Sequence, residues 1–236
     1  MKYGVRAASG GGRSSARETI GRVAAGAVAE KFLREAWGVE IVAWVSAVGD
    51  LETGHVDSET VTRQMVDRTL VRCPEVDLAE RMAARITELK SAGDSIGGVV
   101  TAVCRGVPAG WGEPVFDKLD GDLAKALMSI GAVKGVEIGA GFTASGMRGS
   151  ENNDPISPNG FVTNNAGGIL AGISNGDDIV VRVAVKPIPS IRMDQQTIKT
   201  NHTPTQISIE GRHDIAAIPR INVVCEAMVG VVLADH

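Results

Sequence analysis

The chain has 236 residues, a net charge of −4 and an apolar fraction of 44%, which is enough for one large domain or two small ones with a hydrophobic core. The acidic balance argues against a broad nucleic-acid-binding face, and no apolar run is long enough to span a bilayer. The N-terminus does not resemble a signal peptide, and three cysteines without metal-site spacing indicate buried thiols in a reducing cytoplasm.

The first informative segment, residues 10–19 (GGGRSSARET), combines features of an oxyanion site with those of a helix start. Its three glycines let the backbone come close to a ligand. Ser15 and Glu18 have the spacing of a capping box, so a helix with free N–H groups is expected to begin beside Arg13 and Arg17. The segment favours a phosphate or another oxyanion, and the alternative is an ordinary capped helix with surface arginines.

Hydrophobic periodicity predicts the remaining elements in chain order. Helices are expected over residues 15–37, within 58–70, over 76–91 and 117–130, and within 218–235. Strands are expected at residues 39–48, 97–107, 133–138, 179–186 and 206–210, with a long loop region at 139–168. Gly38 is expected to end the first helix. The order predicts an α+β fold with mostly antiparallel sheet.

Four further segments have patterns that suit a ligand site. Residues 139–144 partly match a dinucleotide fingerprint, but neither the helix nor the acidic partner of that motif follows. Amides beside glycines at 163–176 suit either a hydrogen-bonding wall or a set of tight turns. Lys186 closes a strand before a proline segment, which is either a ligand-facing cation or part of a rigid exit loop.

The fourth segment, Arg212, His213 and Asp214, is a candidate acid–base cluster just before the last helix. His55, His202 and His236 stand alone in the sequence, so solvated side chains are expected there. No spacing of His, Cys and Asp supports a metal site, and no Walker A motif is present.

Taken together, these segments resemble chorismate synthase. The shared motifs follow the family's order over almost the whole chain: GGGRSSARET, GDSIGGVV, GVPAGWGEPVFDKLDGDLAKALMSIGAVKGVEIGAGF, RGSENND, NNAGGILAGISNG, VAVKPIPSI, GRHD and EAMVGVVLADH. Several glycine-bearing blocks in one order are far more specific than any single block. The resemblance implies one domain over residues 1–236, in which a helical layer lies between mostly antiparallel sheets.

The resemblance also implies a reaction. The family consists of carbon–oxygen lyases of the shikimate pathway, which leads to the aromatic amino acids. They convert 5-enolpyruvylshikimate 3-phosphate to chorismate by anti 1,4-elimination of phosphate and require reduced FMN. A cytoplasmic homotetramer is therefore expected, with neither nucleic acid nor membrane as a partner. Some members also have a flavin reductase activity, with which NADP is associated.

Matched residue by residue, the family's flavin-binding positions fall on Arg13, Ser14, Ser15, Gly131, Ala132, Ala171, Lys186, Pro187, Ile188, Pro189, Ser190 and Arg212. Asp214 matches the aspartate that the family is held to use for proton transfer near the flavin, and Arg17 is a candidate substrate contact. The chain departs from the usual residue at four positions: Gly131, Ala171, Ile188 and Ile215.

The largest departure is an absence. The sequence does not contain the family's early histidine in a Gly-Glu-Ser-His context, the substrate arginines that follow it, or a second catalytic histidine just before the position of Lys2. An N-terminally truncated, incomplete domain with little turnover alone is expected, because each general acid–base step contributes roughly 10²–10⁴-fold. The alternative is a non-catalytic remnant that binds flavin or another anion, or that associates with a complete subunit.

Overall fold

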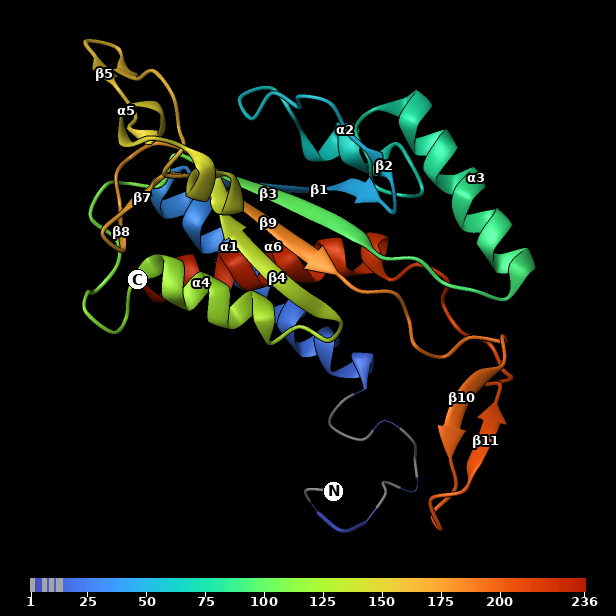
Figure 1. Cartoon of the computed structure of the whole chain (residues 1–236). Helices are drawn as coiled ribbons and strands as arrows, with labels where there is room; N and C mark the ends of the chain where they lie inside the picture. Colours follow the sequence, from blue (N-terminus) through green and yellow to red (C-terminus); the bar gives the residue numbers. More distant parts are fainter. Residues whose placement is uncertain (1–2, 6–7, 9–10, 12–14) are drawn as a thin grey trace.

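The fold is built on a five-stranded antiparallel sheet with the strand order β2-β1-β3-β9-β4. The computed structural model describes residues 3–5, 8, 11 and 15–236 (Figure 1). The strands are β1 (Glu40–Val48), β2 (Leu51–Glu52), β3 (Gly98–Arg105), β4 (Val133–Ile138) and β9 (Ile179–Val185). In β9, the alternate residues from Ile179 to Val185 are buried, so one face of the sheet carries the main core.

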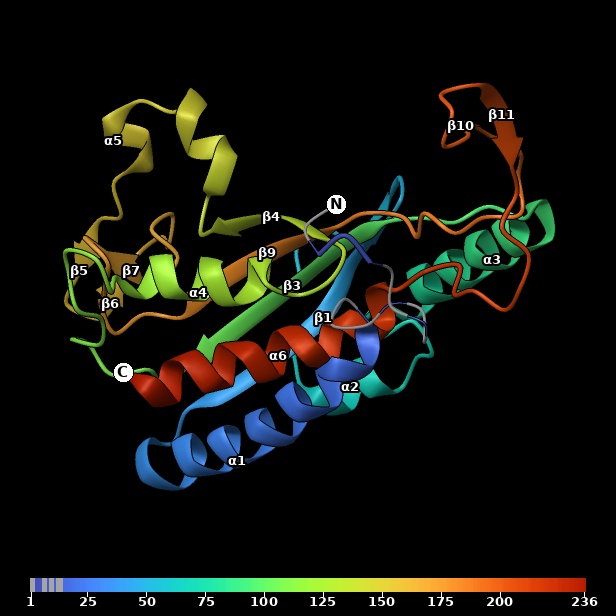
Figure 2. The same ribbon diagram turned by 90° about the horizontal axis from the view of Figure 1, so that it is seen from below.

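Three helices cover that face: α1 (Thr19–Trp37), α4 (Leu119–Met128) and α6 (Ile218–Asp235) (Figures 1 and 2). α6 contacts β1, β3, α1 and α4, and its sequence is apolar on most sides because it lies between the sheet and α1. No helix in the described part of the chain is both long and apolar enough to cross a membrane.

α1 and α6 come unusually close to each other at Gly26. A Cβ atom at Gly26 would lie 2.4 Å from the Cβ and 2.5 Å from the Cα of Ala227. Gly230, one turn further along α6, faces the Cδ1 of Ile41, which a Cβ at Gly230 would approach to 3.4 Å. The absence of a side chain at Gly26 therefore sets the separation of the two helices.

Several large apolar side chains of α1 are exposed to solvent. They are Ile20, Val28, Phe32 and Trp37. The other sheets among the described residues are three two-stranded ribbons, so one large sheet packs on the helical layer and no second large sheet covers α1. The predicted α+β class with antiparallel sheet is confirmed.

The opposite face of the sheet is covered in part by the segment around α2 (Arg63–Asp67). Val61 and Val66 pack there on Val42, Trp44 and Val103 of the sheet. α3 (Val76–Ala92) follows and contacts β2 at the sheet edge. The contacts around α2 form a second, smaller core, whereas Leu78, Ala79 and Met82 of α3 belong to the main core.

Arg63 joins α2 to the helical layer. Its Nη2 lies 2.7 Å from Glu30 Oε1 of α1 and 2.6 Å from Glu226 Oε1 of α6. The Glu226 side chain is only 11% exposed, and burial raises its pKa from 4.5 to about 7, with Arg63 acting in the opposite direction. This carboxyl group is therefore tied to the α1–α6 packing.

Most predicted elements are confirmed, with shifted ends. The strands predicted at 39–48, 97–107, 133–138 and 179–186 correspond to β1, β3, β4 and β9. The helices predicted over 76–91, 117–130 and within 218–235 correspond to α3, α4 and α6, and α2 is a short helix within 58–70. The first helix ends at Trp37, and Gly38 adopts φ 72° as its C-cap.

The capping box predicted at the start of the first helix is wrong. Residues Ala16–Glu18 form a 3-10 turn, and α1 begins only at Thr19. The Ser15 hydroxyl accepts a hydrogen bond from the Arg17 N–H at 3.4 Å. The Glu18 carboxylate does not accept from the Ser15 N–H, as a capping box requires, because it pairs with the Arg22 guanidinium at 2.8 Å.

The strand predicted at residues 206–210 is also misplaced. The chain forms a hairpin of β10 (Gln195–Ile198) and β11 (Pro204–Ile207), which projects from the body in both views (Figures 1 and 2). The turn is closed by the Lys199 N–H, which donates to the Thr203 carbonyl at 2.9 Å. β11 therefore starts and ends earlier than the alternating sequence indicated.

The loop region at 139–168 contains several short elements: a 3-10 helix at Gly141–Gly146, α5 (Gly149–Asn152), β5 (Ile156–Ser157) and β6 (Gly160–Phe161). The carboxylate of Asp154 accepts bonds from the Thr163 hydroxyl at 2.6 Å and from the amides of Asn165 and Ala166 at 2.7 and 2.8 Å. One carboxylate therefore holds much of this loop together. β7 (Ile169–Leu170) and β8 (Ile173–Ser174) follow it.

The close approach at Gly26 predicts opposite effects for two identical substitutions in α1. Gly26→Ala should lower the free energy of unfolding by about 1–3 kcal/mol, because its methyl group would overlap Ala227. Gly21→Ala should raise it by about 0.5–1 kcal/mol, because nothing lies within 4 Å of a Cβ there and alanine favours helix. Urea unfolding followed by circular dichroism measures both, and equal shifts of the same sign would rule out the contact.

The buried Glu226 predicts a pH dependence of stability. Below pH 4.5 its carboxyl is protonated in both states, and above about pH 7 it is ionised in both. Between these values the folded state binds more protons, so stability should fall as pH rises, by roughly 3 kcal/mol in all. Glu226→Gln should remove this part of the fall in urea titrations from pH 4.5 to 7, whereas the exposed control Glu35→Gln should retain it. A Glu226→Gln variant with the slope of the unmodified chain would contradict this.

Candidate functional site

Two of the predicted site segments meet where β9 ends and β4 begins. Gly131 and Ala132 form the turn between α4 and β4, and Ala132 has a left-handed φ of 73°, which is uncommon for a residue with a side chain. The Lys186 N–H, at the end of β9, donates to the Ala132 carbonyl at 2.9 Å. The segment formed by Lys186, Pro187, Ile188, Pro189 and Ser190 therefore begins against the α4–β4 turn.

A third segment is joined to this one through residues 93–97. The Ser95 hydroxyl donates to the Ile188 carbonyl at 2.6 Å. The Ile96 N–H, next in the chain, donates to the Ile215 carbonyl at 2.9 Å, and Ile96 forms a parallel bridge with Ala216. Residues 93–97 thus lie between the Lys186–Ser190 segment and the segment that carries Arg212 and Asp214.

Asp214 lies just before α6 and is paired with a residue of that helix. The Arg220 Nη1 is 2.8 Å from the Asp214 Oδ2, and both side chains are exposed to solvent. They line a hollow of about 760 Å³ between α3 and the start of α6, whose charged and titratable lining residues are Arg72, Lys90, Arg212, His213, Asp214 and Arg220. Cations outnumber the single carboxylate, so this hollow suits an anion.

The first predicted segment is only partly described. Arg13 and Ser14 lie outside the described residues, while Ser15 caps the turn before α1 and Arg17 is exposed within that turn. Arg22 then bonds to the Ser129 hydroxyl at 2.6 Å and to the Ser129 carbonyl at 3.3 Å. The start of α1 is therefore tied to the chain two residues before Gly131.

Arg22 and Ser95 are two residues that the sequence did not single out. The spacing of Arg22 from Glu18 signals only a pair on a helix surface. Ser95 lies in the GDSIGGVV block, which is recognisable in the sequence by its glycines. Nothing in that block indicates which group the Ser95 hydroxyl will bond to. Both act by holding backbone carbonyl groups that are distant in the sequence.

Ala171 is not brought to this site within the chain. It lies in the turn between β7 and β8, with φ 54°, and the neighbouring Gly172 carbonyl accepts from the Leu119 N–H at 2.9 Å. Ala171 is therefore at the start of α4, whereas Gly131 follows its end. A helix of ten residues separates them by about 15 Å.

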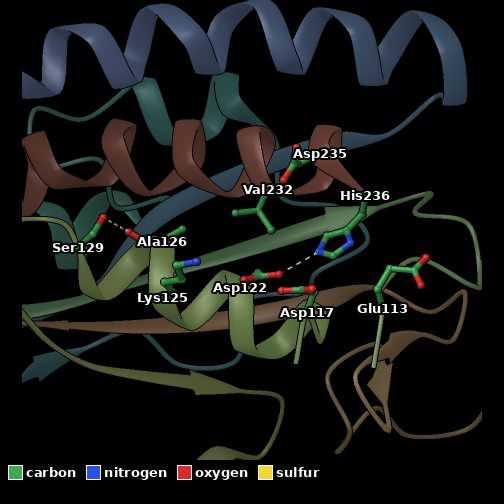
Figure 3. Close-up of a pocket in the computed structure, with 9 residues that line it drawn as sticks. All are labelled: Glu113, Asp117, Asp122, Lys125, Ala126, Ser129, Val232, Asp235 and His236. Carbon is green, nitrogen blue, oxygen red and sulfur yellow. Dashed lines mark hydrogen bonds and ion pairs between the residues drawn. The ribbon is translucent and has the colours of Figure 1, made fainter. Parts of the chain in front are cut away.

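A second hollow, of about 520 Å³, lies at the opposite end of α6 from Asp214 (Figure 3). Its lining residues are Glu113, Asp117, Asp122, Lys125, Ala126, Ser129, Val232, Asp235 and His236. The His236 Nε2 is 3.5 Å from the Asp122 Oδ2. None of the predicted site residues lines this hollow, and no group of three or more metal-ligating side chains occurs among the described residues.

Comparison with known proteins adds a consistent result. A sequence model of the family described as chorismate synthase matches residues 1–236. The chain is 63% identical over 235 residues to a chorismate synthase of Desulfosudis oleivorans and 62% identical over 235 residues to that of Syntrophobacter fumaroxidans. In both cases the match covers 100% of this chain and 65% of the relative.

A solved structure is similar as well. A crystal structure of chorismate synthase superposes with a TM-score of 0.74 at 35% sequence identity. The superposition covers 94% of this chain and 62% of the other. The chain therefore spans a little under two thirds of the length of the proteins that it matches.

Proposed function

Because the chain belongs to the chorismate synthase family, we propose that it takes part in the conversion of 5-enolpyruvylshikimate 3-phosphate to chorismate. The reaction is an anti 1,4-elimination of phosphate with reduced FMN, catalysed by a carbon–oxygen lyase of the shikimate pathway. The observation that carries the proposal is the meeting of three family segments at one end of the sheet: the turn at Ala132, the segment from Lys186, and the segment with Arg212 and Asp214.

The residues of this site fit an anionic, hydrogen-bonding cofactor such as FMN. Lys186 and Arg212 are exposed cations next to the joined segments, and either can hold a phosphate or carboxylate. Pro187 and Pro189 have no N–H group, so the Ile188 amide is the donor between them, and it makes no hydrogen bond within the described part of the chain. A donor of this kind remains free for a ligand.

Asp214 is the proposed proton-handling group. Its carboxylate is paired with Arg220 from the first turn of α6 and lines the same hollow as Arg212. Reduced FMN, when bound, supplies the electron-rich ring that the elimination requires. The proposed role of Asp214 is to hold or accept a proton at its carboxylate oxygen.

The substrate carries a phosphate and carboxylates, so it needs cations beyond those that face the flavin. Arg17, exposed at the start of α1, is the proposed contact from the first segment. A cytoplasmic homo-oligomer, in the family a homotetramer, and the association of some members with NADP are further parts of the proposal. The exposed apolar side chains of α1 are consistent with association.

The second candidate is a flavin- or anion-binding function without turnover. It is favoured by one observation: in the hollow between α3 and the start of α6, cations outnumber the single carboxylate, which suits the binding of an anion. The two functions differ in one assay, because only the first gives chorismate from 5-enolpyruvylshikimate 3-phosphate and reduced FMN.

Titration with FMN tests the site. The chain should quench FMN fluorescence on binding, and Arg212→Ala should raise the dissociation constant roughly tenfold or more, because a charge-assisted hydrogen bond contributes about 1.5–3 kcal/mol. Arg81→Ala is the matched control, since Arg81 is an exposed arginine of α3 that does not line the hollow. Equal dissociation constants for the two variants would remove Arg212 from the site.

A further inference from the structure

We infer that Ser95 is a positioning residue for the Lys186–Ser190 segment, and that its hydroxyl group sets the direction in which this segment presents its hydrogen-bond donors to a ligand. The role in flavin binding rests on the proposed function. The role in holding the segment rests only on the geometry of the chain.

The Lys186–Ser190 segment has few backbone N–H groups that can hold it to the rest of the protein. Pro187 and Pro189 have no N–H group, so two of the five residues cannot donate a backbone hydrogen bond. Neither Ile188 nor Ser190 donates its amide to another described residue. Beyond the Lys186 amide, the backbone of the segment can therefore form hydrogen bonds with the rest of the described chain only through its carbonyl groups.

Ser95 supplies the strongest of these contacts. Its hydroxyl lies 2.6 Å from the Ile188 carbonyl oxygen, in the middle of the segment, and the contact is partly buried. The other donor to a carbonyl of the segment is the Gln195 side chain, 3.5 Å from the Pro189 oxygen, which is at the limit for a hydrogen bond. The next anchors along the chain are the Ile191 carbonyl, which accepts from the Ile209 N–H at 3.0 Å, and the Arg192 N–H, which donates to the Gly93 carbonyl at 2.9 Å.

Ser95 is itself fixed by close packing of the backbone. The Asp94 carboxylate accepts from the Ser95 N–H at 2.8 Å, and the neighbouring Ile96 is bonded to Ile215. At Gly97 a Cβ atom would lie 2.5 Å from the Val185 carbonyl oxygen and 3.1 Å from the Pro187 Cδ. The backbone around Ser95 is therefore held against both neighbouring segments, and the hydroxyl has a defined position.

The bond to the Ile188 carbonyl fixes the orientation of the peptide that joins Ile188 to Pro189. That orientation restricts the path of the chain into Ser190, because the φ angle of Pro189 is fixed by its ring and only its ψ angle is left to vary. Residues 93–97, which carry Ser95, also contact the segment of Asp214 through Ile96. Ser95 thus couples the position of the proposed flavin-facing donors to that of the proposed proton-handling residue.

The experiment uses a pair of variants that differ in the hydroxyl group but have nearly the same shape, Ser95→Thr and Ser95→Val. FMN titration should give a dissociation constant near that of the unmodified chain for Ser95→Thr and one about 3- to 10-fold higher for Ser95→Val, as expected for the loss of one neutral hydrogen bond. Ser91→Ala is the control, because the Ser91 hydroxyl also donates to a carbonyl, that of Thr87 at 3.2 Å, but lies in α3 away from the segment.

Amide hydrogen exchange in the absence of FMN gives a second, independent measurement. Ser95→Val should speed exchange at the Lys186 and Arg192 amides, which are the bonded amides on either side of Ile188. Ser95→Thr and Ser91→Ala should leave it unchanged. Thermal unfolding of each variant shows whether the chain remains folded.

The outcomes separate the two proposals. Equal FMN affinity and equal exchange for Ser95→Thr and Ser95→Val would overturn the role of Ser95 and leave the proposed function standing. Absence of FMN binding by the unmodified chain, together with faster exchange in Ser95→Val alone, would count against the proposed function and still support the positioning role. A Ser95→Val variant that unfolds while Ser95→Thr stays folded supports a structural need for the hydroxyl, but overturns its specific role in orienting the segment.

Discussion

The contact between Gly26 and Ala227 sets how closely α1 can pack on α6, and the enclosure of α6 between α1 and the sheet depends on that distance. With α1 this close, α6 is enclosed between it and the sheet, so a helix that is apolar on most sides is buried rather than exposed. The start of α6 carries Arg220, which holds Asp214, and α1 carries Arg22, which holds Ser129. Two edges of the candidate site are therefore positioned by the same pair of helices.

The elements of the fold could largely be predicted because their signals are local. A run of β-branched residues is enough to indicate β1, and the left-handed conformation at Gly38 needs no more than a glycine after an amphipathic stretch. The failures are of a different kind. Glu18 has the spacing for a capping box, but the nearby Arg22 competes for its carboxylate, and the end of β11 depends on a turn whose register is not visible in the alternation of residues.

The candidate site could be predicted as a set of segments but not as an arrangement. Some of the bonds that bring the segments together join backbone groups, as between Lys186 and Ala132 or between Ile96 and Ile215, and such bonds leave no side-chain signal in the sequence. The resemblance to a family matches residues to positions in the sequence but gives no distances between them. Ala171 and Gly131 are therefore both matched to flavin-binding positions, although α4 lies between them in this chain.

The two prolines that flank Ile188 have a consequence for the thermodynamics of ligand binding. Fixing the backbone of a flexible residue costs about 1–2 kcal/mol in conformational entropy, and a loop that orders around its ligand bears that cost on binding. In the Lys186–Ser190 segment the proline rings already restrict the chain before any ligand arrives. Association there should lose little backbone entropy, so a bound group can exchange repeatedly without the wall of its site having to refold each time.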